Sequence, residues 1–192
     1  MERNSFSRVA ALSCLLVVVL AGCAGMNVKE DSVQGTTNIV RPSAIYIRTF
    51  DPGTSWEGDF GGKSRDSFIQ QEMQSLDQRL IAQLQDIAPT SPVGGSLPAN
   101  GLLVTGQLQR VNAGSGVARY FMGGFGVGAR EVTGRVQIFD LAKSTTTPIL
   151  AFNIEGGSRG EGGIIGAVDN LNADWDRIGR ETKALLLKRM QP

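Results

Sequence analysis

The sequence contains no histidine and only two cysteines, Cys14 and Cys23. Histidine is the commonest general base and metal ligand, so its absence excludes the Ser/His/Asp and Cys/His hydrolases and the usual zinc sites. An enzyme that used carboxylates alone would need two of them to converge in one cleft, and no motif indicates this. We therefore expect no catalytic activity, no metal and no cofactor.

The sequence also lacks an excess of either charge and any apolar run long enough to span a bilayer. It has 19 basic and 18 acidic side chains, which argues against binding to nucleic acid. The apolar run Val9–Ala21 is shorter than the roughly 20 residues that a membrane-spanning helix needs. With Arg3 and Arg8 before it and Gly22 after it, this run is typical of a signal peptide over residues 1–22.

The four residues Leu20-Ala21-Gly22-Cys23 resemble the bacterial lipoprotein box. In that motif the peptide is cut before the cysteine, whose thiol carries a diacylglycerol with acyl chains such as palmitate. Each buried methylene adds about 0.8 kcal/mol of membrane affinity, so two or three chains anchor a protein stably. Ala24 in place of aspartate favours the outer membrane, facing the periplasm, by the sorting rule of enteric bacteria. The alternative is a secreted, non-lipidated chain.

Lipidation leaves the mature chain without a thiol for a disulfide, so packing alone must stabilise it. Residues 24–42 show no periodicity and are mostly polar, which predicts that Cys23 is followed by a flexible tether up to residue 42. A coil of this length has an end-to-end distance of about 25 Å. Residues 43–192 are long enough for a single globular domain.

Hydrophobic periodicity in that domain predicts the order β-α-β-β-β-α. The expected strands are 44–50, 102–111, 130–141 and 149–154, the expected helices are 65–88 and 167–190, and 89–101 is an expected loop. A right-handed crossover makes the first two strands parallel. The prediction is an α+β, two-layer fold with a four-stranded mixed sheet and two amphipathic helices on one face.

Individual residues refine this prediction. Asp77 lies away from the apolar stripe of the first expected helix, whereas Trp175 lies on the apolar face of the second and is expected in the core. Gly134 interrupts the third strand and indicates a bulge.

The stretch 114–129 is glycine-rich and apolar, and it has three interpretations. Gly124, Gly126 and Ala129 fit a loose dinucleotide-binding spacing, but this motif must open a helix, and a strand is expected after it. The second interpretation is a contact with a membrane or another subunit, and the third is an extension folded over the sheet. Its candidate interaction residues are Arg119, Tyr120, Phe121, Gly124, Phe125, Gly126 and Gly128.

A second glycine-rich stretch, residues 156–166, precedes the last expected helix. Its backbone amides and Arg159 are suited to bind an anion, but a flexible strand-to-helix connection explains the composition more simply and is the favoured interpretation. We include Arg159 in the candidate interaction surface.

The chain resembles a bacterial lipoprotein family known as domain of unknown function 4410. The likeness covers about residues 40–190 and is carried by 45–50 (Ile-Tyr-Ile-Arg-Thr-Phe), 112–120 (Asn-Ala-Gly-Ser-Gly-Val-Ala-Arg-Tyr), 124–129 (Gly-Phe-Gly-Val-Gly-Ala) and 156–158 (Gly-Gly-Ser). The resemblance implies a fold and a location in the cell envelope, and it supplies no catalytic residues.

These observations predict a lipid-anchored, non-enzymatic envelope protein that binds another protein through the surface around 119–128. The alternative is a self-assembling subunit of an envelope pore or secretion apparatus that uses the stretch 114–129 for intersubunit or membrane contacts.

Overall fold

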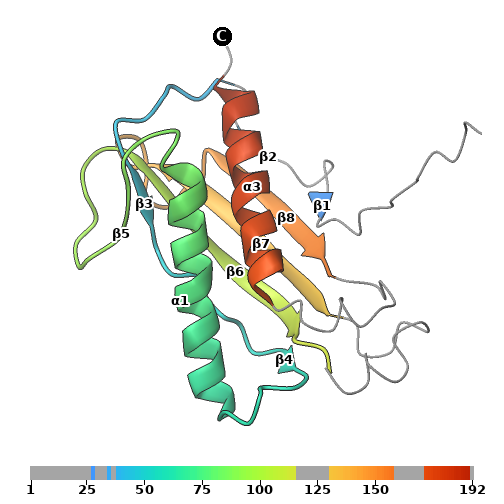
Figure 1. Ribbon diagram of the computed structural model, residues 1–192. Coiled ribbons are helices and arrows are strands. Elements are labelled where there is room, and N and C mark those ends of the chain that lie inside the picture. Colours follow the sequence, from blue (N-terminus) through green and yellow to red (C-terminus); the bar gives the residue numbers. More distant parts are fainter. Residues whose placement is uncertain (1–26, 29–33, 36–37, 116–129, 158–170, 191–192) are drawn as a thin grey trace, which may run out of the picture.

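The computed structural model describes residues 27–28, 34–35, 38–115, 130–157 and 171–190. A mixed β-sheet forms one layer, and two helices, α1 (Arg65–Leu84) and α3 (Leu171–Arg189), lie side by side on one of its faces (Figure 1). The strands are β1 (Asn27–Val28), β2 (Gln34–Gly35), β3 (Ile45–Ile47), β4 (Trp56–Glu57), β5 (Thr90–Pro92), β6 (Leu102–Asn112), β7 (Glu131–Asp140) and β8 (Leu150–Gly156).

The sheet runs β1-β8-β7-β6-β3-β5, with β2 also paired to β8 and β4 to β6. This confirms an α+β fold with a mixed sheet and two helices, but the expected four strands and their simple order are wrong. The additional strands contain two or three residues each, which is too short for an alternating pattern. One of them, β5, starts inside the expected loop 89–101 and contains Pro92, which an edge strand tolerates.

The centre of the fold is a parallel crossover from β3 through α1 to β6. Ile45 lies opposite Leu102 and Ile47 opposite Val104 in parallel register, as expected for the first two predicted strands. Ser64 caps α1, because its side chain accepts a hydrogen bond from the Ser67 amide.

The main core fills the space between the sheet and the helices. Trp175 is fully buried there, as predicted, and its indole Nε1 donates a hydrogen bond to Glu72 Oε2 at 2.8 Å. The sheet contributes every second residue of its long strands to this core, for example Val132, Val136 and Ile138 of β7. Because the alternate residues point the other way, the opposite face is mainly polar.

A smaller apolar cluster lies on that opposite face. It joins Leu103, Phe139 and Leu141, and Val93 and Leu97 pack against it. Because β5 and β6 flank β3 on its two sides, the segment that joins them must pass over β3. Val93 and Leu97 belong to this segment and pack on the cluster.

The bulge that Gly134 indicated lies in the partner strand. The pairing of β6 with β7 shifts between Leu108 and Arg110, directly across from Gly134 and Thr133. A Cβ at residue 134 would lie 2.8 Å from the carbonyl oxygen of Gln107, so the glycine is needed for close packing beside the bulge.

Strand pairing reaches into residues 23–42, where we expected a flexible tether. Both β1 and β2 pair antiparallel with β8. Ile39 is buried in the main core, and its amide donates a hydrogen bond to the carbonyl of Arg189 at 2.8 Å. Among the described residues of this segment, the contacts combine backbone pairing with the buried side chain of Ile39, a pattern that hydrophobic periodicity does not detect.

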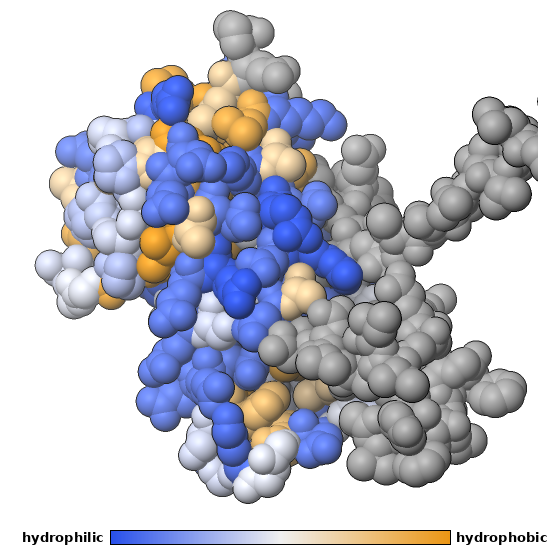
Figure 2. Space-filling view, viewed as in Figure 1, coloured by the Kyte–Doolittle hydropathy of each residue, from blue (hydrophilic) through white to orange (hydrophobic). Residues whose placement is uncertain are grey.

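The outward surface of the helix layer is mainly hydrophilic (Figure 2). In the described ranges, no helix combines the length and the apolar character that a membrane crossing requires.

The packing of Phe50 on Gly106 is a sensitive point of the core. A Cβ at Gly106 would lie 2.4 Å from Phe50 Cε2 and 2.5 Å from the carbonyl oxygen of Arg135. We expect Gly106→Ala to lower the free energy of unfolding by about 1–3 kcal/mol, measured by denaturant titration. Gly94→Ala is the matched control, since nothing lies within 4 Å of its Cβ position. Equal stability of the two variants would contradict this packing.

Candidate functional site

All the candidate residues from the sequence lie outside the described ranges. They are Cys23, Arg119, Tyr120, Phe121, Gly124, Phe125, Gly126, Gly128 and Arg159. The structure does describe the residues that flank the two glycine-rich stretches, and these flanks lie close together.

The flanks meet where β6 ends, β7 begins and β8 ends, at the lower right of Figure 1. We call this the loop-root end and define it by residues 112–115, 130–131 and 156–157. Asn112 lies opposite Glu131 across β6 and β7, and Val132 lies opposite Gly156 across β7 and β8. Three separate chain segments therefore converge at one end of the sheet.

Backbone contacts fasten the first glycine-rich stretch where it leaves β6. The Ala113 amide donates to the carbonyl of Glu57 at 2.8 Å, and the Asp59 amide donates to the carbonyl of Gly114 at 2.9 Å. The Asn112 side chain accepts a hydrogen bond from the Gly114 amide at 2.8 Å.

The return of that stretch and the start of the second one are in direct contact. A Cβ at Gly157 would lie only 2.0 Å from the carbonyl oxygen of Arg130, so only glycine fits there. The Arg130 side chain is buried and faces Asp174 in the first turn of α3, with 3.5 Å between Nε and Oδ2. This pair joins β7 and α3 beside both stretches.

A surface ion-pair network lies at the same end. Arg110 contacts Glu131 at 3.2 Å and Glu57 at 3.5 Å, and the three side chains are each about half exposed. Exposed pairs contribute little to stability, generally under about 1 kcal/mol. This network therefore determines the surface charge of the loop-root end more than its stability.

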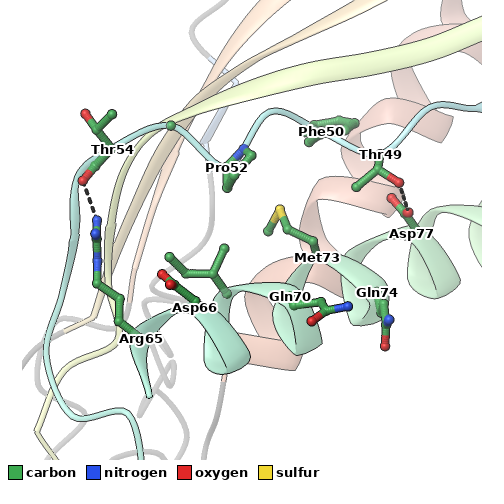
Figure 3. Close-up of a pocket in the computed structure, with 12 residues that line it drawn as sticks. Thr49, Phe50, Pro52, Thr54, Arg65, Asp66, Gln70, Met73, Gln74 and Asp77 are labelled. Atoms are coloured by element: carbon green, nitrogen blue, oxygen red, sulfur yellow. Dashed lines mark hydrogen bonds between the residues drawn. The ribbon is translucent and has the colours of Figure 1, made fainter. Parts of the chain in front are cut away.

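A separate pocket of about 610 Å³ lies between α1 and the segment that follows β3 (Figure 3). Phe50, Ile69 and Met73 supply apolar surface. Asp66 and Asp77 both line the pocket but are eleven residues apart on α1, which is about 16 Å along the helix axis. Two carboxylates at this separation do not form an acid–base pair.

Asp77 is the polar anchor of this pocket. Its Oδ2 accepts a hydrogen bond from the Thr49 hydroxyl at 2.6 Å, while its Oδ1 is buried with no hydrogen-bond partner among the described residues. Burial raises the pKa of the Asp77 carboxyl above its usual value, and the Thr49 hydrogen bond partly opposes this effect. Asp77 therefore adds a hydrogen-bonded and partly desolvated carboxyl to the wall of the pocket.

We missed the pocket in the sequence because Asp77 lies outside the main apolar stripe. Its position four residues after Met73, a member of that stripe, places Asp77 at the border of the stripe and facing the same way. Elsewhere in the ranges that the structure describes, no three His, Cys, Asp or Glu side chains gather as a metal site would require.

The comparisons with known proteins define the relationship of this chain. The family model "Domain of unknown function (DUF4410)" matches residues 45–172, which include α1, β6, β7, β8 and the loop-root end. The chain belongs to this family. No curated protein matches it.

One solved structure shows a similar fold. The PelC dodecamer from Paraburkholderia phytofirmans is 12% identical, with 83% of this chain and 96% of that chain covered and a TM-score of 0.50. A variant of that protein gives the same identity and coverage with a TM-score of 0.48. An uncharacterised protein is 11% identical, with 80% of this chain and 99% of that chain covered and a TM-score of 0.44. At such identities the likeness concerns the fold alone.

The raised pKa of Asp77 predicts a specific pH dependence of stability. The folded state favours the protonated carboxyl, so this contribution is present at low pH and is lost as the pH rises through the pKa of Asp77. We expect Asp77→Asn, which stays neutral, to be more stable than the parent at pH 7 by less than about 1 kcal/mol, with the difference vanishing near pH 3. Thermal unfolding at several pH values measures it.

Thr49→Val provides the opposite change. It removes the hydroxyl donor from the ionised carboxylate, so we expect lower stability at pH 7 by about 0.5–1.5 kcal/mol and a smaller loss at pH 3. For Asp77→Asn, a loss of stability that is the same at all pH values would contradict the raised pKa of the Asp77 carboxyl.

Proposed function

We propose that this protein is a lipid-anchored cell-envelope protein that binds a protein partner and is not an enzyme. The observation that supports this function best is that the described flanks of both glycine-rich stretches lie together at the loop-root end. Arg130 and Gly157 are in contact there, and Asp59 fastens the carbonyl of Gly114 nearby. Loops whose ends lie side by side on a scaffold are suited to form one continuous binding surface.

The anchor is part of the same proposal. Cys23 follows an apolar run and small residues in the manner of the lipoprotein box, and its acyl chains place the domain at a membrane. With Ala24 after it, the outer membrane facing the periplasm is the favoured location. A lipid anchor confines the search for partners to the membrane surface.

A pull-down from detergent-solubilised envelopes tests the binding surface. We expect the parent chain to recover a specific partner and the double variant Arg119→Ala with Phe125→Ser to lose most of it, because the charge and an aromatic anchor are removed. The matched control, Lys143→Ala with Leu187→Ser, removes one positive charge and one large apolar side chain at exposed positions outside this surface. Equal recovery by all three chains would contradict the proposed surface.

A second candidate function is self-assembly as a subunit of an envelope pore or secretion apparatus. It is favoured by the fold similarity to PelC, whose solved structure is a dodecamer. The similarity covers 96% of the PelC chain. In this case the stretch 114–129 supplies contacts between copies.

Native mass spectrometry of the lipidated chain in detergent separates the two functions. Self-assembly predicts a discrete oligomer that the Arg119→Ala, Phe125→Ser variant dissociates, because hot-spot side chains at an interface carry most of its free energy. Monomers alone, at concentrations well above those in the membrane, would contradict the second candidate and leave the first.

A further inference from the structure

The N-terminal segment of the domain runs along the edge of the sheet. In β1, Asn27 lies opposite Glu155 and Val28 opposite Ile154, next to the loop-root end. In β2, Gly35 lies opposite Leu150, at the other end of β8. The chain before Asn27 therefore joins the domain beside Glu155.

Only a short piece of chain separates this junction from the lipidation site. Cys23 precedes Asn27 by four residues. A chain extends at most about 3.6 Å per residue, so Cys23 lies within roughly 14 Å of Asn27 in any conformation. The pairing of β1 with β8 thus removes most of the reach that an unpaired tether up to residue 42 would have.

We propose that the loop-root end faces the phospholipid bilayer and contacts its headgroups. This proposal rests on the lipid anchor of the proposed function. The other end of the sheet, where the chain turns between β7 and β8, then points away from the membrane. Since β7 has ten residues, that turn is about 30 Å farther from the bilayer.

The chemistry of the loop-root end fits the headgroup layer. Glu57, Glu131 and Arg110 form a half-exposed network of charges, which would be costly in hydrocarbon and is readily accommodated among headgroups and water. Ser115 and Arg130, the described residues on either side of 116–129, both lie at this end. The connection between them therefore starts and finishes near the membrane.

Site-specific labelling tests this orientation, because the mature chain has no thiol besides Cys23. Single cysteines replace Glu57 at the loop-root end or Thr145 in the turn after β7, both exposed, and each carries a fluorophore. The lipidated full chain is placed in vesicles of phosphatidylethanolamine and phosphatidylglycerol that contain a headgroup nitroxide. We expect at least about twofold stronger quenching at residue 57, given the separation of about 30 Å.

Lengthening the junction provides the matched control. Ten Gly/Ser residues inserted after Gly25 keep the lipid and the domain but release the loop-root end from the membrane, so the difference between the two labels should shrink. Flotation of the same samples, with Cys23→Ser as the baseline, reports the anchor separately. A chain that fails to float overturns the anchor and the orientation together. A chain that floats with equal quenching at both labels, or with stronger quenching at residue 145, overturns the orientation alone.

Discussion

The arrangement of this molecule depends on the buried contact between Arg130 and Asp174. Both side chains are completely shielded from solvent, with 3.5 Å between Nε and Oδ2. Removing a charge from water costs several kcal/mol, so each of these groups requires its partner. The contact fixes the beginning of β7 against the first turn of α3. Because one glycine-rich stretch ends just before Arg130 and the other just before α3, the pair also determines where both meet the domain.

The helix layer provides stability without disulfides and determines the relative position of the helices through polar contacts. Arg79 pairs with Asp176 at 2.5 Å, and Ser75 donates to Asn172 at 2.6 Å. Gly179 lets the helices approach, since a Cβ there would lie 2.8 Å from a side-chain carbon of α1. These contacts are specific in geometry, whereas the apolar core beneath them supplies most of the free energy of burial.

The sequence predicted the elements whose side chains repeat with a clear period. Both helices and the strands β6, β7 and β8 have long apolar patterns, so their positions were correct to within a few residues. The short strands depend on backbone pairing with distant segments, and two or three residues carry no period. Asp77 was missed for a related reason. The pocket that it lines forms between α1 and a segment that includes Thr49, 28 positions away in the sequence.

The pairing of β1 with β8 also concerns how the protein reaches its folded state. Asn27 is synthesised near the beginning of the chain, and its partner Glu155 comes near the end. Contacts between such distant segments form late, because a very long loop must close first. Until then the outer edge of β8 is an unpaired strand, the kind of edge on which β proteins aggregate. The newly made chain is therefore most prone to aggregation in the interval before β1 pairs with β8.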